Sequence, residues 1–251
     1  MNLGRADRLK ALGLWPVWRL RQTPGGNAGG ESVAEVEENA DAGFVAEAPV
    51  RETPAHHPSV ADLDWESLRA AVKSCTRCPL SQSRTQGVPG VGDVNAEWLF
   101  IGEAPGADED RQGEPFVGQA GKLLDAMMAG LGLQRGRNVY IANILKSRPP
   151  GNRDPKPDEV EACLPYLERQ IDLIQPKLIV VLGRIAAQTL LVTDTPIGKL
   201  RGRTHQYRGV PMVVTYHPAY LLRNPADKAK AWDDLVLARR TMQSLKSGAA
   251  P

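Results

Sequence analysis

Four short apolar runs, separated by helical patterns, restrict the fold of this chain more than any other feature of its sequence. They have the length and composition of buried strands and cover Trp98–Ile101, Val139–Ala142, Leu178–Leu182 and Met212–Tyr216. Helical patterns cover Trp65–Ser74, Ala120–Leu131, Pro157–Ile174, Arg184–Leu191 and Ala226–Leu245. Strands that alternate with helices favour a parallel sheet with helices on both faces. The sequence therefore predicts an α/β fold of three layers, αβα, around a central four-stranded, mainly parallel sheet.

This pattern occupies residues 61–246, and the preceding residues differ from it in composition. Residues 1–22 interleave Leu and Trp with basic side chains, which predicts a short amphipathic helical segment. Residues 23–60 are rich in Gly, Ala, Glu and Pro and bury too little apolar surface to offset the entropy of ordering. We therefore expect a disordered acidic linker there, and a docking segment at 1–22 that binds a partner protein or DNA.

Charge and cysteine content indicate the kind of partner and the compartment. Residues 23–64 carry a net charge of −8 and residues 65–251 a net charge of +6, which suits a polyanionic partner. The odd number of cysteines, three, argues against a disulfide framework and for a reducing compartment. No run approaches the roughly 18 apolar residues of a membrane span, and residues 1–22 lack a secretory signal. We expect a cytoplasmic protein with no membrane partner.

The residues that follow the predicted strands indicate a site. The first strand ends in the glycine-bounded turn 102–106, next to a cluster of carboxylates, the second ends at Asn143, and the last ends at His217. Ligands of open parallel sheets bind beyond the carboxyl ends of the strands, where these side chains would meet. The glycine turn lets backbone amides approach a ligand, and carboxylates can handle a proton or a water molecule. Taken alone, the acidic turn is equally compatible with an ordinary solvated strand-to-helix connection.

The motifs at these strand ends resemble those of the family-4 uracil-DNA glycosylases, within the uracil-DNA glycosylase superfamily. They are Gly-Glu-Ala-Pro-Gly at 102–106 with Glu109, Pro-Phe-Val-Gly at 115–118, Asn143 before Arg-Pro-Pro-Gly-Asn-Arg at 148–153, and His-Pro at 217–218 before Leu-Leu-Arg at 221–223. The resemblance implies a monofunctional DNA glycosylase that hydrolyses the N-glycosidic bond of uracil in DNA during base-excision repair. Two alternatives stay open: a relative that excises other deaminated bases, and a DNA-damage-binding protein without catalytic activity.

The resemblance also implies roles for individual residues. Phe116 would stack on the flipped base, and the Asn143 amide would read the uracil N3–H and O4. Backbone amides around Gly102 and Ala104, together with His217, would stabilise negative charge on uracil O2. Water activation and stabilisation of the sugar cation would fall to a group that the sequence does not rank. That group consists of Glu103, Glu109 and Asn152.

Contacts to DNA would come from loops beside these motifs. Arginines there are natural phosphate partners, and apolar side chains after His217 can enter the base stack as the nucleotide leaves it. The candidates are Arg148, Arg153, Arg201, Leu221, Leu222 and Arg223. For each leucine, simple burial in the core is an open alternative.

The resemblance further implies a [4Fe–4S] cluster held by four cysteines. Cys75 and Cys78 form a C-x2-C pair, and Cys163 matches a third ligand position on a helix. The fourth position is Ser147, where the family pattern has cysteine. Three thiolates with a serine alkoxide or an exogenous ligand can still hold four irons, whereas a three-iron cluster and a protein without iron are alternatives. We expect the cluster to be structural and to be weakened by Ser147.

Overall fold

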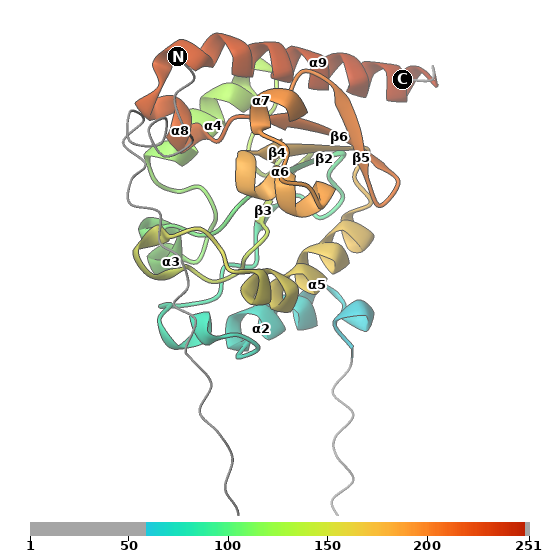
Figure 1. The fold of residues 1–251 in the computed structure, drawn as a ribbon. Coiled ribbons are helices and arrows are strands. Elements are labelled where there is room, and N and C mark those ends of the chain that lie inside the picture. The colour runs from blue at the N-terminus through green and yellow to red at the C-terminus, as the bar shows by residue number, and fades with distance from the viewer. Residues whose placement is uncertain (1–58, 249–251) are drawn as a thin grey trace, which may run out of the picture. The chain divides into compact units, whose positions relative to one another are not determined.

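The four predicted strands lie together in the centre of one sheet (Figure 1). The structure is a computed structural model that describes residues 59–248, so the predicted docking segment 1–22 and nearly all of the linker 23–60 lie outside the described residues. The strand order is β1-β3-β2-β4-β6-β5. The bounds are β1 Val91–Gly92, β2 Trp98–Gly102, β3 Val139–Asn143, β4 Leu178–Leu182, β5 Thr204–Tyr207 and β6 Val210–Thr215. The central strands β3, β2, β4 and β6 run parallel, and each edge strand runs antiparallel to its neighbour.

The prediction of four strands is wrong in number, because the sheet has six. Both missed strands lie at its edges and lack an apolar run. Strand β1 has only two residues, and its Gly92 packs so closely on β3 that a Cβ atom there would lie 2.2 Å from the Val139 carbonyl oxygen. Strand β5 is mostly polar and alternates between exposed and half-buried residues. Edge strands of this kind give no hydrophobic signal.

Helices cover both faces of the sheet, which confirms the three-layer α/β fold (Figure 1). The α-helices are α2 Trp65–Ser74, α3 Ala107–Gln112, α4 Gln119–Gly130, α5 Pro157–Ile174, α6 Arg184–Leu191, α7 Ile197–Leu200, α8 Pro218–Arg223 and α9 Lys228–Ser247. Short 3-10 helices are η1 Val60–Asp62, η2 Pro79–Gln82, η3 Pro150–Asn152 and η4 Pro225–Asp227. The five predicted helices are confirmed, three with the predicted bounds and two displaced by one or two residues. None of the helices within residues 59–248 is long and apolar enough to cross a membrane.

Each central strand is buried on both faces and sends alternate side chains into two separate cores. Leu99 and Ile101 of β2 pack with α5, α6 and α7, whereas Trp98 and Phe100 pack with α4, α8 and α9. This two-sided burial explains why these strands read as continuous apolar runs rather than as an alternating pattern. It also fixes the register, because a shift by one residue would exchange the two cores. The carboxyl ends of the four parallel strands are thereby held at one rigid edge.

Candidate active site

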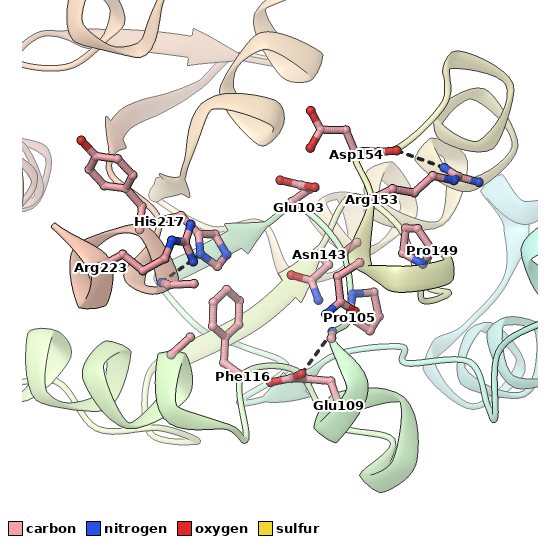
Figure 2. A pocket seen from close by; sticks show the side chains of 16 residues that line it. Glu103, Pro105, Glu109, Phe116, Asn143, Pro149, Arg153, Asp154, His217 and Arg223 are labelled. Carbon is pink, nitrogen blue, oxygen red and sulfur yellow. Dashed lines mark hydrogen bonds between the residues drawn. The ribbon is translucent and has the colours of Figure 1, made fainter.

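A cavity of about 390 Å³ opens at the carboxyl edge of the parallel strands (Figure 2). The segments after β2, β3 and β6 bring Glu103, Asn143 and His217 into its lining. Phe116, from the connection between α3 and α4, lines it as well. The predicted convergence of the strand ends is therefore confirmed. Its cause is the parallel arrangement, which places every strand-to-helix connection of this kind on the same side.

Gly102, the last residue of β2, lets two side chains of the cavity approach the strand closely. A Cβ atom at this position would lie 2.4 Å from Asn143 Oδ1 and 2.6 Å from Phe116 Cζ. Real Cβ atoms do not approach other atoms this closely, so any side chain at residue 102 would displace the amide and the ring together. Glycine is required here because of space rather than backbone conformation.

Asn143 presents an unsatisfied amide to the cavity. Its side chain is only 2% exposed, and its Oδ1 atom has no hydrogen-bond partner among the described residues. Buried polar atoms in native proteins are nearly always hydrogen-bonded, so an unpaired one in a cavity wall indicates a ligand group. A primary amide donates and accepts side by side, and it therefore matches a planar ring with adjacent N–H and C=O groups.

His217 lines the same cavity and is a neutral imidazole with a fixed tautomer. Its Nδ1 accepts the backbone N–H of Ala219 at 3.1 Å, which caps helix α8, so the ring proton resides on Nε2. Burial lowers the pKa of His217 to about 4, with a further contribution from the Arg223 guanidinium and opposition from Glu109. The ring centroid lies 5.5 Å from that of Phe116. The site thus offers a neutral N–H donor beside an aromatic face.

Among the described carboxylates that line the cavity, Glu103 has a strongly raised pKa. Its pKa is raised to about 7, mainly by burial and also by the Asp154 carboxylate, while the Arg184 guanidinium opposes the shift. Arg184 and Asp154 form an exposed ion pair of 2.9 Å beside it. A carboxylate that titrates near neutrality is suited to accept a proton during a reaction.

Glu109 also lines the cavity, but its carboxylate is already hydrogen-bonded to backbone N–H groups. Its Oε1 accepts the backbone N–H groups of Val117 and Gly118 at 3.0 and 3.3 Å, and its Oε2 accepts that of Gly106 at 3.1 Å. These bonds assign the Glu109 carboxylate to holding the loops rather than to receiving a proton. Sequence alone left the two glutamates unranked, and the structure separates them by their hydrogen bonds.

Of the other predicted site residues, Ala104 and Asn152 line the cavity, and Asn152 Oδ1 accepts a hydrogen bond from Arg148 Nε at 2.8 Å. Arg153 and Arg223 line it too. Two lining residues with polar groups, Asp154 and Tyr220, were missed in the sequence. Each lies inside or directly beside a recognised motif, and that adjacency was the only signal available.

Two predicted DNA contacts are corrected by the structure. Leu221 is 1% exposed because the segment after His217 forms helix α8 rather than a loop, and this helix packs Leu221 into the core. Leu222 on the same helix is 44% exposed. Arg201 donates to the buried Asp234 carboxylate at 2.9 Å and stacks over Tyr216, so its guanidinium serves the fold. Arg153 also binds a buried carboxylate, that of Glu159, but its side chain is more exposed than that of Arg201 (36% against 15%) and it lines the cavity. Arg153 therefore remains a candidate for DNA contact, together with Leu222, Arg148 and Arg223.

The predicted cluster ligands lie on the α5 side of the sheet. Cys163 on α5 is buried, and its sulfur accepts the Lys146 backbone N–H at 3.4 Å. Burial raises the pKa of the Cys163 thiol, and the nearby thiols of Cys78 and Cys75 add to the shift. Ser147, also buried, accepts a hydrogen bond from Arg84 Nη1 at 2.6 Å. Within residues 59–248, no three His, Cys, Asp or Glu side chains are grouped around a position for a single metal ion.

Comparison with known proteins agrees with this geometry. Residues 89–236 match the model of the uracil DNA glycosylase superfamily. A Type-4 uracil-DNA glycosylase of Archaeoglobus fulgidus is 49% identical over 162 residues, which cover 61% of this chain and 81% of the relative. One from Pyrobaculum aerophilum is 42% identical, over 70% of this chain and 93% of the relative. A Type-5 uracil-DNA glycosylase of the same organism is 31% identical, over 62% and 75% of the two chains. The chain therefore belongs to the uracil DNA glycosylase superfamily, and within it to the Type-4 uracil-DNA glycosylases.

Proposed function

We propose that this protein is a DNA glycosylase that removes uracil from DNA by hydrolysing the N-glycosidic bond, as a step of base-excision repair. The observation that carries the proposal is the buried Asn143 Oδ1, which has no hydrogen-bond partner in the described part of the chain and lies in a cavity that also holds Phe116 and a neutral His217. A flipped uracil pairs with this amide through its N3–H and O4, and its ring stacks on Phe116. The names of the Type-4 relatives support the same substrate.

Departure of the base leaves negative charge on uracil, mainly at O2. His217 meets that charge with its Nε2–H, because Nδ1 is occupied by the Ala219 amide. A neutral imidazole donates without first having to lose or gain a proton, and its hydrogen bond strengthens as the charge develops. The burial that lowers its pKa to about 4 therefore suits this role at neutral pH.

On the sugar side, the ionised Glu103 carboxylate faces the cation that forms as the C1′–N1 bond breaks. Water then forms a bond to C1′ and passes a proton to Glu103, while uracil leaves as an anion and is protonated afterwards. No hydrogen bond from the described residues contributes to the pKa of Glu103, so its oxygens can receive water. Asn152, bonded to Arg148, extends over the same cavity and helps to hold that water.

The raised pKa of Glu103 predicts the pH dependence of excision. Because the reaction needs the ionised form, kcat/KM should rise with pH through about 7 and then level off. Asp154→Asn removes a like charge and releases Arg184, and both changes favour ionised Glu103. The rise should therefore move to lower pH in this variant. The control is Asp172→Asn, because Asp172 forms an ion pair with Arg208 away from the cavity. Identical profiles for wild type and Asp154→Asn would remove Glu103 from this role.

Uracil-containing and abasic oligonucleotides separate the proposed activity from its alternatives. A glycosylase converts uracil sites to alkali-labile abasic sites and leaves the strand intact until alkali is added. A protein that only binds damage would retain both oligonucleotides unchanged. A relative for other deaminated bases would act on hypoxanthine or xanthine in preference to uracil. Excision of uracil well above excision of those bases is the expected result.

The cysteine site supports an iron–sulfur cluster as a further part of the proposal. The thiols of Cys75 and Cys78 lie near enough to Cys163 to raise the pKa of its thiol, and a cluster of this kind is held by cysteine thiolates. Ser147 would complete the set, and the Arg84 guanidinium beside it favours the alkoxide form that a ligand needs. When bound, the cluster would supply a structural link between α5 and the loop that carries Arg148 and Asn152.

This assignment predicts iron and sulfide in anaerobically purified protein. Serine is a harder and more basic ligand than cysteine, so Ser147→Cys should retain the cluster longer in air than the wild type. Visible absorbance and iron analysis during exposure to air measure the difference. Iron-free protein that excises uracil at full rate would contradict a role for the cluster.

A further inference from the structure

Phe116 is held in a backbone conformation that a bulky residue rarely adopts. Its φ angle is +55°, in the left-handed region, and its side chain is 6% exposed. An aromatic residue in this region is strained and keeps the conformation only where its surroundings enforce it.

Arg135, in the connection between α4 and β3, holds the carbonyl side of this turn. Its Nη1 donates to the Pro115 carbonyl at 3.0 Å, and its Nη2 donates to the Phe116 carbonyl at 2.8 Å. Asp125 on α4 accepts from Nε at 3.1 Å and so orients the guanidinium. The side chain of Arg135 is 23% exposed and does not line the cavity.

Glu109 holds the amide side of the same turn. Its Oε1 accepts the N–H groups of Val117 and Gly118, the two residues after Phe116. Gly121, in the first turn of α4, leaves the space that the Phe116 carbonyl occupies, because a Cβ atom there would lie 1.8 Å from that oxygen. The backbone before and after Phe116 is thus bonded from two separate elements.

We propose that Arg135 is a positioning residue of the site, which together with Glu109 clamps the turn and presents the Phe116 ring to the flipped base. The role of the ring rests on the proposed function, whereas the clamp itself does not. The planar fork of arginine can donate to two successive carbonyls at once, which a lysine ammonium cannot do with the same geometry. Arg135 therefore affects excision through Phe116 and not through a contact of its own with DNA.

A double-mutant cycle tests this inference. Arg135→Met should lower kcat/KM on uracil-containing DNA about tenfold in the wild-type background, and less than about twofold in a Phe116→Ala background, because the clamp then has no ring to position. Arg208→Met, which removes another Arg–Asp pair far from the cavity, is the control and should leave kcat/KM unchanged. Equal losses from Arg135→Met in both backgrounds, or no loss in the wild-type background, would overturn the proposal.

Hydrogen exchange provides a readout that does not depend on catalysis. Releasing the carbonyl side of the turn should speed exchange of the Val117 and Gly118 amides about tenfold in Arg135→Met, while Arg208→Met should leave them unchanged. If the wild-type protein excised no uracil, the proposed function would fail, and this measurement would still decide the clamp. Unchanged exchange of both amides in Arg135→Met would then overturn it.

Discussion

Asn143→Ala is expected to lower kcat/KM for uracil excision by about 2 kcal/mol of transition-state stabilisation, which is about 30-fold, or by more. The variant removes both the donor and the acceptor that meet the uracil edge. In the wild type the Oδ1 atom is already desolvated and has no partner within residues 59–248, so the base gains the hydrogen bond without displacing one of them. Loss of one hydrogen-bonding partner at such a polar site costs far more binding free energy than loss of an apolar contact.

The control for this prediction is Asn95→Ala. Asn95 is an exposed asparagine that precedes β2, at the opposite edge of the sheet. Its replacement by alanine should leave excision unchanged. Single-turnover rates and thermal unfolding of both variants separate lost chemistry from lost stability. Excision at the wild-type rate by Asn143→Ala would remove the amide as the reader of the base.

Gly102→Ala is expected to have an effect at least as large, about 100-fold or more on kcat/KM, although it deletes no functional group. The added methyl would stand 2.4 Å from Asn143 Oδ1 and 2.6 Å from the Phe116 ring, so both groups must move. A displacement of about 1 Å in a positioning group is enough for a loss of this size. The variant thus tests whether the amide and the ring act as one arrangement.

A second glycine provides the matched comparison. Gly198 in α7 has no atom of residues 59–248 within 4 Å of its hypothetical Cβ position, so Gly198→Ala should leave both activity and structure intact. Single-turnover excision by the two variants is the measurement. Near-normal excision by Gly102→Ala would show that the cavity tolerates displacement of both groups and would contradict the arrangement described here.

The central fold was predictable because the parallel strands are buried on both faces and therefore read as continuous apolar runs. Helix α5 could be placed residue for residue, since Pro157 stands at its first position and apolar residues recur along it. Strands β1 and β5 could not be found, because one has two residues and the other is polar. Helix α8 was read as a loop, since six residues are too few to show a helical period.

Most of the side chains that line the cavity were predictable, apart from Asp154 and Tyr220, but their division of labour was not. Asn143 and His217 follow strands, and the parallel sheet alone brings them to one edge. Which glutamate can accept a proton depends on the backbone amides eight and nine residues after Glu109. These amides donate hydrogen bonds to Glu109 and not to Glu103. No sequence pattern reports such bonds. The positioning role of Arg135 escaped for the same reason, because its partners are carbonyl oxygens of a distant turn.

The most direct test of the central claim is the amount of free uracil released from a uracil-containing duplex by excess protein, measured by mass spectrometry alongside the number of abasic sites. We expect one uracil for each abasic site, with intact strands and with no thymine released from a matched duplex. Protein that binds the duplex but releases no uracil would contradict the central claim.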